Sequence, residues 1–183
     1  MRTLSPFSSL PALSLGVCLG LGLAGCAVED EPMPPVDGEL QLGGAPLGGE
    51  GWVELTGGAE VELVPGAQGG FHVWLNARVT GAAGPLYFER EARRADSGEL
   101  VLRSLPQAVD VPEDAMEDWW ETPSAWPAFM CPSPIGIVVH DQPITFSVEL
   151  VDDLGEVLAH DEITLIPRCP ASHLDFCHEI CSG

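Results

Sequence analysis

Residues 71–80 alternate between apolar and polar side chains, and this alternation constrains the fold of the chain most. In the run FHVWLNARVT, the apolar positions are Phe71, Val73, Leu75, Ala77 and Val79, and most of the others are polar. Successive side chains of a strand point to opposite sides, so ten alternating residues predict a β-strand with one buried face and one solvated face. The chain is therefore expected to fold around a sheet.

Four further segments carry strand and turn signals that complete an all-β prediction. Residues 144–150 alternate like the first strand, and the sequence DDLG predicts a hairpin turn into residues 156–166. Residues 86–92 and 99–104 predict a second hairpin. About seven short strands, with turns roughly every 8–12 residues, favour an immunoglobulin-like β-sandwich.

One position breaks the pattern of the strand at 156–166. Val157 and Ala159 share a face with Asp161, and Ile163 and Leu165 continue on that face. A charged residue in an apolar row is explained by a local change of register, because an extra residue re-aims the side chains that follow. A β-bulge near Asp161 is therefore expected.

Residues 106–134 are rich in proline and tryptophan and are predicted to form a long insertion. Asp110 is expected to cap a short helix that has Pro112 in its first turn. Four large aromatic residues follow within a short stretch: Trp119, Trp120, Trp126 and Phe129. Such a group either packs beneath the insertion as a small core or faces outward as a binding patch, because exposed aromatic side chains mark interaction sites.

Four cysteines lie beyond the N-terminal region, at Cys131, Cys169, Cys177 and Cys181. An even number of cysteines in an exported domain predicts two disulfides, with three possible pairings. We favour Cys131–Cys169, which would join the end of the insertion to the end of the last strand. Cys177–Cys181 would then close a small loop in the tail.

The Cys/His-rich tail at 171–183 also offers an alternative chemistry. His173, Cys177, His178 and Cys181 carry thiol and imidazole groups, which are ligands for zinc and copper. Export favours oxidised cysteines over free thiolates, so disulfides are the preferred interpretation and no metal or other cofactor is expected. Metal binding by these four residues is the alternative.

The N-terminus has the pattern of an export signal. Arg2 precedes an apolar run at 10–23, which is shorter than the roughly 20 residues that a membrane-spanning helix needs. Leu23, Ala24, Gly25 and Cys26 follow, and these four residues resemble the lipobox of bacterial lipoproteins. The resemblance implies that residues 1–25 are a signal peptide and that Cys26 carries lipid, palmitate included, which anchors the protein to a membrane.

A second resemblance covers about residues 60–170. The sequence PGAQGGFHVW at 65–74 is similar to a turn and strand found in small uncharacterised bacterial lipoproteins with one immunoglobulin-like domain. The likeness implies a fold and carries no known activity.

Residues 26–50 are predicted to be a disordered tether between the lipid and the domain. After Cys26 they contain four prolines, six acidic residues and repeated Gly-Gly, with few side chains that could form a core. The sandwich domain is then expected at 51–170. The acidic cluster at 29–31 resembles the surface-display signal of some Gram-negative lineages, which implies an outer-membrane or cell-surface location.

Charge excludes two classes of partner. The formal net charge is −21, and all seven basic residues are arginine. Nucleic acid binding needs clustered cations, and so does electrostatic docking on anionic lipid. The lipid at Cys26 is therefore the expected membrane contact.

The sequence contains none of the common catalytic signatures, such as a nucleophile elbow, a zinc-protease pair, a phosphate-binding loop or a dinucleotide fingerprint. We therefore expect a non-enzymatic, lipid-anchored binding or structural module of the cell envelope. Its partner would be an envelope protein or a polysaccharide. An extracytoplasmic metal-binding protein is the alternative.

Overall fold

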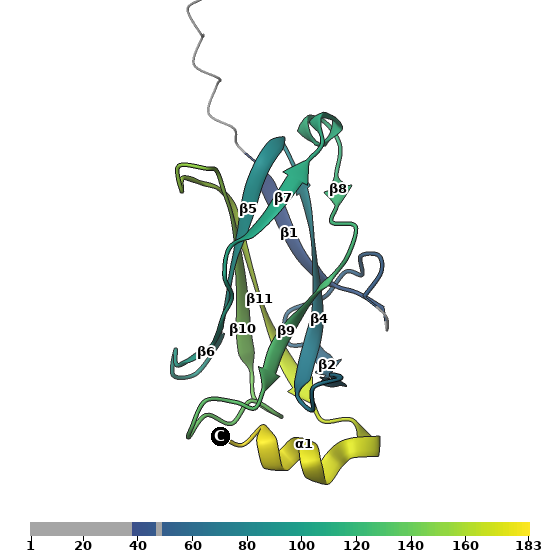
Figure 1. Cartoon of the computed structure of the whole chain (residues 1–183), viewed down its shortest axis with the longest axis vertical. Helices are drawn as coiled ribbons and strands as arrows, with labels where there is room; N and C mark the ends of the chain where they lie inside the picture. The colour runs from purple at the N-terminus through teal and green to yellow at the C-terminus, as the bar shows by residue number, and fades with distance from the viewer. Residues whose placement is uncertain (1–37, 47–48) are drawn as a thin grey trace, which may run out of the picture. The chain divides into compact units, whose positions relative to one another are not determined.

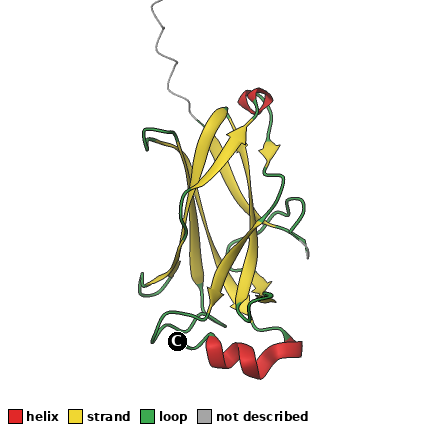
Figure 2. Ribbon diagram, in the orientation of Figure 1, coloured by secondary structure: helices red, strands yellow, loops and turns green. Residues whose placement is uncertain are grey.

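The computed structural model describes residues 38–46 and 49–183, and it is an all-β sandwich of two sheets with short helical segments (Figures 1 and 2). Its strands are β1 (Glu39–Gly44), β2 (Glu60–Glu62), β3 (Val64–Pro65), β4 (Phe71–Thr80), β5 (Gly84–Arg94), β6 (Leu100–Arg103), β7 (Gln107–Val111), β8 (Trp120–Glu121), β9 (Trp126–Cys131), β10 (Ile144–Val151) and β11 (Val157–Arg168). The helical segments are the 3-10 helices η1 (Glu113–Met116) and η2 (Ala171–His173) and the helix α1 (Leu174–Ile180). The all-β sandwich prediction is confirmed.

The five-stranded sheet is built around β4, the strand with the strongest alternation. Strands β1 and β3 pair with one edge of β4, and strands β8 and β9 pair with its other edge, all antiparallel. The register places Leu42 opposite Ala77 and Ala128 opposite Val73. β4 is therefore the central strand of this sheet.

The six-stranded sheet contains both predicted hairpins. Strands β10 and β11 pair through a turn in which the Asp152 N–H donates to the carbonyl of Glu156. β5 pairs with β10 on one side and with both β6 and β7 on the other. The short strand β2 runs parallel to β11 and completes the sheet.

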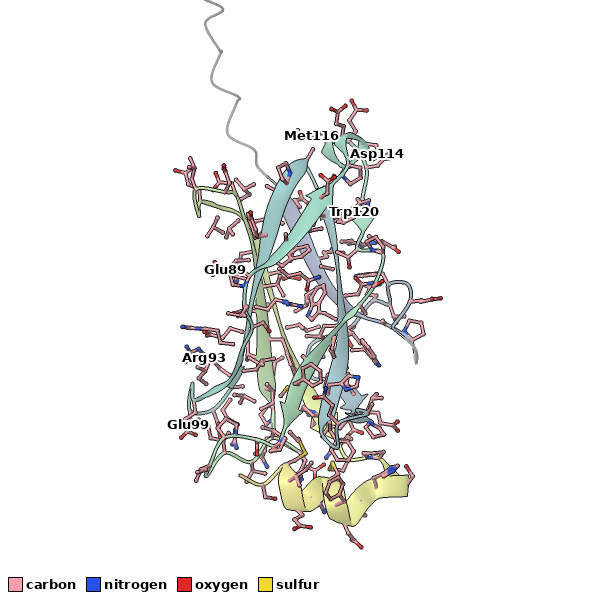
Figure 3. All side chains as sticks on the ribbon, viewed as in Figure 1. Glu89, Arg93, Glu99, Asp114, Met116 and Trp120 are labelled. Carbon is pink, nitrogen blue, oxygen red and sulfur yellow. A yellow bond between two sulfur atoms is a disulfide. The ribbon has the colours of Figure 1, made fainter. Side chains whose placement is uncertain are left out.

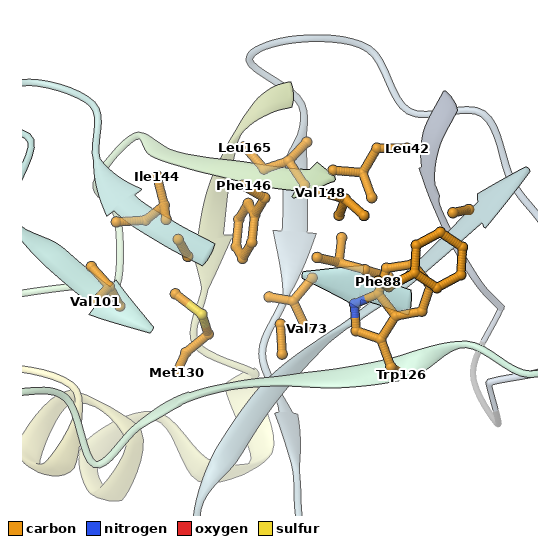
Figure 4. Close-up of a cluster of buried hydrophobic side chains, with 14 of the residues drawn as sticks. Leu42, Val73, Phe88, Val101, Trp126, Met130, Ile144, Phe146, Val148 and Leu165 are labelled. Atoms are coloured by element: carbon orange, nitrogen blue, oxygen red, sulfur yellow. The ribbon is translucent and has the colours of Figure 1, made fainter. Parts of the chain in front are cut away.

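The core lies between the two sheets, where the alternating apolar residues meet. The largest fully buried side chains come from both sheets and include Phe71, Phe88, Phe146 and Met130. The rings of Phe88 on β5 and Trp126 on β9 lie 5.7 Å apart between their centroids, so they connect the two sheets (Figure 4). Burial of a large side chain of this kind contributes about 1.5–3 kcal/mol relative to an exposed one.

The sandwich begins earlier than residue 51, so part of the predicted tether is folded. Residues 39–44 form β1, where Leu40 and Leu42 are 6% and 4% exposed. Their burial outweighs the glycines and acidic residues that favoured disorder, because β1 completes one edge of the core. The predicted boundary at residue 50 is wrong. The predicted signal peptide at 1–25, the lipid site Cys26 and the cluster at 29–31 lie outside the described residues.

The predicted insertion at 106–134 is also an integral part of the sandwich. β7 extends the six-stranded sheet, whereas β8 and β9 extend the five-stranded sheet. The predicted helix is the four-residue 3-10 helix η1, which follows Pro112 and has no side-chain cap, whereas Asp110 belongs to β7. Trp126, Ala128 and Met130 alternate into the core, a pattern that Pro127 and Phe129 obscure in the sequence.

A hydrogen bond explains why Asp161 lies in the apolar row of β11. Its carboxylate accepts a hydrogen bond of 2.7 Å from the backbone N–H of Leu42, so it bridges β11 to the edge of β1. The register shift in the β10–β11 pair lies between Leu150 and Val151 instead. The bulge predicted near Asp161 is thus displaced to the stretch between Val157 and Ala159, and it does not explain the inward carboxylate, which binds a strand edge that needs an acceptor.

The tail folds across one end of the sandwich as η2 and α1, and two disulfides hold it there (Figure 2). The bonds join Cys131 to Cys181 and Cys169 to Cys177. Two disulfides were predicted, but the favoured pairing is wrong. Cys177 and Cys181 lie one helical turn apart on the same face of α1, so the ends of β9 and β11 each supply one partner. Among the described residues, no helix has the length and apolar character to span a bilayer.

Candidate functional site

The side of β4 that points away from the core carries a row of aromatic and polar side chains. Together with residues from neighbouring segments, this row forms a surface that we call the aromatic face: Trp52, His72, Trp74, Arg78, Trp119 and Phe129. The even-numbered residues of β4 point to this side because the odd-numbered ones fill the core, although other segments bury His72 and Asn76 there. The aromatic face is the strongest candidate for a binding site.

Arg78 lies between two tryptophan rings at one end of the aromatic face. Its guanidinium carbon is 4.1 Å from the ring centroid of Trp52 and 4.7 Å from that of Trp119. Its Nε donates a hydrogen bond of 2.7 Å to Gln41 Oε1, which fixes the plane of the guanidinium. Trp119 is 39% exposed, so the stack presents an aromatic ring to solvent. Cation–π contacts of this kind hold the three side chains together.

His72 forms a second cluster at the other end of the aromatic face. Its ring meets Trp74 edge-on with centroids 4.6 Å apart, and Phe129 lies 5.7 Å away. His72 is only 6% exposed, and neither ring nitrogen has a hydrogen-bond partner among the described residues. Burial lowers the pKa of His72 below its ordinary value of 6.5, because the charged imidazolium loses its hydration. Phe129 is 59% exposed and covers the histidine.

The segment at 49–53 crosses the aromatic face between its two ends. Asn76 is fully buried on β4, and its Nδ2 donates a hydrogen bond of 2.7 Å to the carbonyl of Gly51. Thr122 Oγ1 donates to Asn76 Oδ1 from the opposite side. Gly49 has a φ of +77°, and a Cβ there would lie 3.2 Å from the ring of Trp74. The crossing therefore depends on Asn76 and on a glycine at 49.

The predicted aromatic patch is divided by the fold. Trp126 is 6% exposed and belongs to the core, and Trp120 is half-buried opposite Val79 on the neighbouring strand (Figure 3). Trp119 and Phe129 reach the aromatic face, at its two ends. Sequence reasoning missed Trp52, Trp74 and Arg78 as members of this surface, although the even positions of β4 were a signal for two of them.

The predicted metal-ligand set in the tail is not assembled. Cys177 and Cys181 each belong to a disulfide, so neither sulfur is a thiolate ligand. The ring of His173 lies 6.3 Å from Phe71, whereas the ring of His178 stacks on His140. The two histidines therefore lie in different environments.

A cavity of about 650 Å³ on the six-stranded sheet is the main competitor to the aromatic face. Its wall includes Glu89, Glu91, Glu149 and Arg103, and the side chain of Glu89 lies on the outward side of β5 (Figure 3). Arg93 is the main group that lowers the pKa of Glu91, by hydrogen bonding, and Arg103 adds to the effect. The carboxylate of Glu91 is thus already paired within the protein, which leaves the aromatic face as the better candidate.

Comparison with known protein families, curated proteins and solved structures finds no match to this chain. The class of protein that the described residues define is an all-β sandwich with two disulfides.

Proposed function

We propose that this protein is a lipid-anchored module of the bacterial cell envelope that binds a neutral polysaccharide through the aromatic face. The observation that carries this proposal is the stack of Trp52, Arg78 and Trp119 on the same sheet face as the exposed Phe129. The lipid at Cys26 would hold the sandwich at the membrane and leave this face free for a ligand.

The location outside the cytoplasm rests on two independent features. The lipobox resemblance at residues 23–26 implies export and lipidation. The pairs Cys131–Cys181 and Cys169–Cys177 support an oxidising compartment, because structural disulfides persist there and are rare in the cytosol.

The ligand class follows from the chemistry of the aromatic face. The negative π-face of a tryptophan ring attracts the C–H bonds of a sugar ring, and the guanidinium of Arg78 can donate hydrogen bonds to hydroxyl groups. The formal net charge of −21 opposes an anionic polymer, since like charges repel over the whole surface. A neutral polysaccharide fits both conditions.

The strand order supports the immunoglobulin-like part of the prediction. In that fold the first strand pairs with the second and the second with the fifth, whereas the third, sixth and seventh form the other sheet. If β1, β4, β5, β9, β10 and β11 are taken as strands A, B, C, E, F and G, every one of these pairings occurs. These pairings support an immunoglobulin-like topology for the sandwich.

Cosedimentation with an insoluble, uncharged glucan tests the ligand class. The full chain should sediment with the glucan, and Trp119→Ala and Phe129→Ala should each weaken binding, because each removes an exposed ring of the aromatic face. Phe176→Ala is the matched control, since Phe176 is a similarly exposed aromatic residue on α1. Binding of an acidic polysaccharide with equal affinity, or of an envelope protein instead of any glycan, would refute the neutral-polysaccharide assignment.

Intact mass of the mature protein tests the anchor separately. The wild-type chain expressed in a bacterium should carry lipid on Cys26 and fractionate with membranes, and Cys26→Ser should remain unprocessed or be released. An unmodified mature N-terminus would contradict the anchor and leave the ligand test intact.

A further inference from the structure

His140 and His178 come together at the end of the sandwich that α1 covers. Their rings are stacked with centroids 4.4 Å apart and an angle of 24° between the ring planes. His140 lies in the loop before β10, and His178 lies on α1, so residues far apart in the chain meet. Ligand atoms of His140, His178 and Asp141 all lie within 4.8 Å of one another.

The backbone around both histidines is firmly held. His178 lies between Cys177 and Cys181, and each of these cysteines is bonded to the sandwich. The residue before His140, Val139, is fully buried, and its N–H donates a hydrogen bond of 3.0 Å to the carbonyl of Cys181. The backbone that carries the two rings is therefore fixed, which lowers the entropic cost of binding a shared ligand.

Asp141 and its surroundings orient the ring of His140. Asp141 Oδ2 lies 3.1 Å from His140 Nδ1, while Arg168 donates to Asp141 Oδ1. A carboxylate on one ring nitrogen directs the other nitrogen, Nε2, toward a metal in many metal sites. At present His140 Nε2 lies 3.2 Å from the hydroxyl of Ser182, whose own hydrogen bond goes to the carbonyl of His178.

We propose that His140 and His178 form a binding site for a divalent transition-metal ion, with Asp141 as the residue that positions His140. This site is independent of the polysaccharide proposal. It uses only one of the tail residues expected from the sequence as ligands, His178, and needs no thiolate.

The geometry and chemistry of the pair suit such an ion. Two nitrogens bound to a tetrahedral zinc ion lie about 3.4 Å apart, given Zn–N bonds of about 2.1 Å. Ligand atoms of the two histidines already lie within 4.8 Å of one another, and the partly exposed rings would have to rotate to bring their nitrogens to this spacing. Imidazole nitrogen favours Cu²⁺, Ni²⁺ and Zn²⁺, whereas Mg²⁺ and Ca²⁺ prefer oxygen ligands. Two protein nitrogens leave the other positions of the ion to water, so the ion should exchange readily.

Thermal unfolding and titration calorimetry with Cu²⁺, Zn²⁺ and Ca²⁺ test this proposal on the full, oxidised chain. One Cu²⁺ or Zn²⁺ ion should bind per chain, with Cu²⁺ the tighter of the two. At a free concentration of 100 times Kd, the ion should raise Tm by about 5–10 °C. Ca²⁺ is the control for non-specific binding to the acidic surface, and it should give no comparable shift in Tm.

Variants separate this site from the rest of the tail. His140→Gln and His178→Gln should each abolish the one-ion stoichiometry, and Asp141→Asn should weaken binding about 10- to 100-fold as the loss of an orienting group does. His173→Gln is the matched control, because His173 lies one turn earlier and contacts Phe71 instead. A thiol titration that finds no free cysteine in a variant verifies that both disulfides have formed in it.

The electron paramagnetic resonance spectrum of bound Cu²⁺ adds a readout that stability alone cannot give. Coupling to two imidazole nitrogens is expected in the wild type and to one in either histidine variant. Binding of Zn²⁺ no tighter than Ca²⁺, or binding that survives in the double variant His140→Gln/His178→Gln, would overturn the proposal.

Discussion

His72 is almost fully buried between Trp74 and Phe129, and both of its ring nitrogens lack a partner among the described residues. Polar groups buried in this way lower stability unless a gain elsewhere compensates. Here the compensation comes from aromatic packing, since the neutral imidazole fills the space beneath Phe129. The histidine supports the aromatic face from below.

This arrangement predicts a loss of stability in mild acid. The folded-state pKa of His72 lies below 6.5, so the unfolded chain binds the proton more readily. The free energy of unfolding should therefore fall as the pH drops below about 6.5, until the folded-state pKa is reached. Urea unfolding at pH 7.5 and 5.0 measures this difference.

The substitution His72→Leu isolates the contribution of this one ring, because leucine does not titrate. It should reduce the difference between the two pH values relative to the wild type. Equal pH dependence in His72→Leu and the wild type would disprove the assignment. Carboxylates whose pKa is lowered, such as Glu91 and Asp141, lose their pairing only in stronger acid and do not enter this range.

Asn76 is the second residue on which the aromatic face depends. We predict that Asn76→Ala lowers the free energy of unfolding by about 2 kcal/mol, because the buried hydroxyl of Thr122 loses its acceptor and the Gly51 carbonyl its donor. Chemical denaturation measures the loss. Gln142→Ala is the comparison, since this half-buried loop amide accepts a single hydrogen bond within the described part of the chain, from Arg94, and a smaller loss is expected there. A change below about 0.5 kcal/mol would show that water replaces both partners.

At the scale of the elements, sequence patterns predicted the strands whose alternation is long and unbroken. β4 and β10 fall into this group, because a long run of period two outweighs local exceptions, and turn signals located the two hairpins. The pattern failed where strands are short or where proline interrupts them. β1 reads as a glycine-rich tether, and β9 contains Pro127 and the exposed Phe129.

The members of the aromatic face could be predicted from the sequence only in part. The sequence placed Trp119 and Phe129 in a candidate patch, but it also placed Trp126 there, which the core requires. Trp52 joins the face only through its contact with Arg78, and nothing in the local sequence specifies that contact. Tertiary packing, unlike periodicity, cannot be derived from neighbours in the chain.

The structure of β1 predicts a sharp limit for truncation. A chain that begins at residue 38 keeps Leu40 and Leu42 in the core, whereas one that begins at residue 45 loses both. The expected loss is about 3–6 kcal/mol, from two buried leucines at about 1.5–3 kcal/mol each. Urea unfolding of the two chains measures this difference. Equal midpoints would show that the sandwich does not need β1.

At the scale of the whole domain, the two disulfides hold one end of the sandwich and do not cross its centre. The central contact between the sheets is formed by Phe88 and Trp126 instead. The sequence predicted two bonds but not their pairing. Cys177 on α1 and Cys181 directly after it lie on one face, so the cysteine at the end of either β9 or β11 could bond to either of them. Partner choice therefore depends on where β9 and β11 end.

We predict that the two disulfides contribute unequally to stability. In the chain-entropy treatment, Cys131–Cys181, with a separation of 50 residues, stabilises by about 4 kcal/mol. Cys169–Cys177, with a separation of 8, stabilises by about 2.5 kcal/mol. Chemical denaturation of Cys131→Ala/Cys181→Ala and Cys169→Ala/Cys177→Ala compares these values. Non-reducing peptide mapping of the wild type should show these pairs, and a Cys131–Cys169 peptide would refute them.

The bond between Cys131 and Cys181 also determines how the domain would respond to mechanical load. β10, β11 and the whole of α1 lie inside the covalent loop that it closes. A pull on the two ends of the chain therefore cannot extend those 50 residues, which withholds roughly 170 Å of contour length at about 3.4 Å per residue. Force on the two ends would therefore pass through the strands that precede Cys131 and across the disulfide, and the enclosed hairpin of β10 and β11 would carry none of it along the chain.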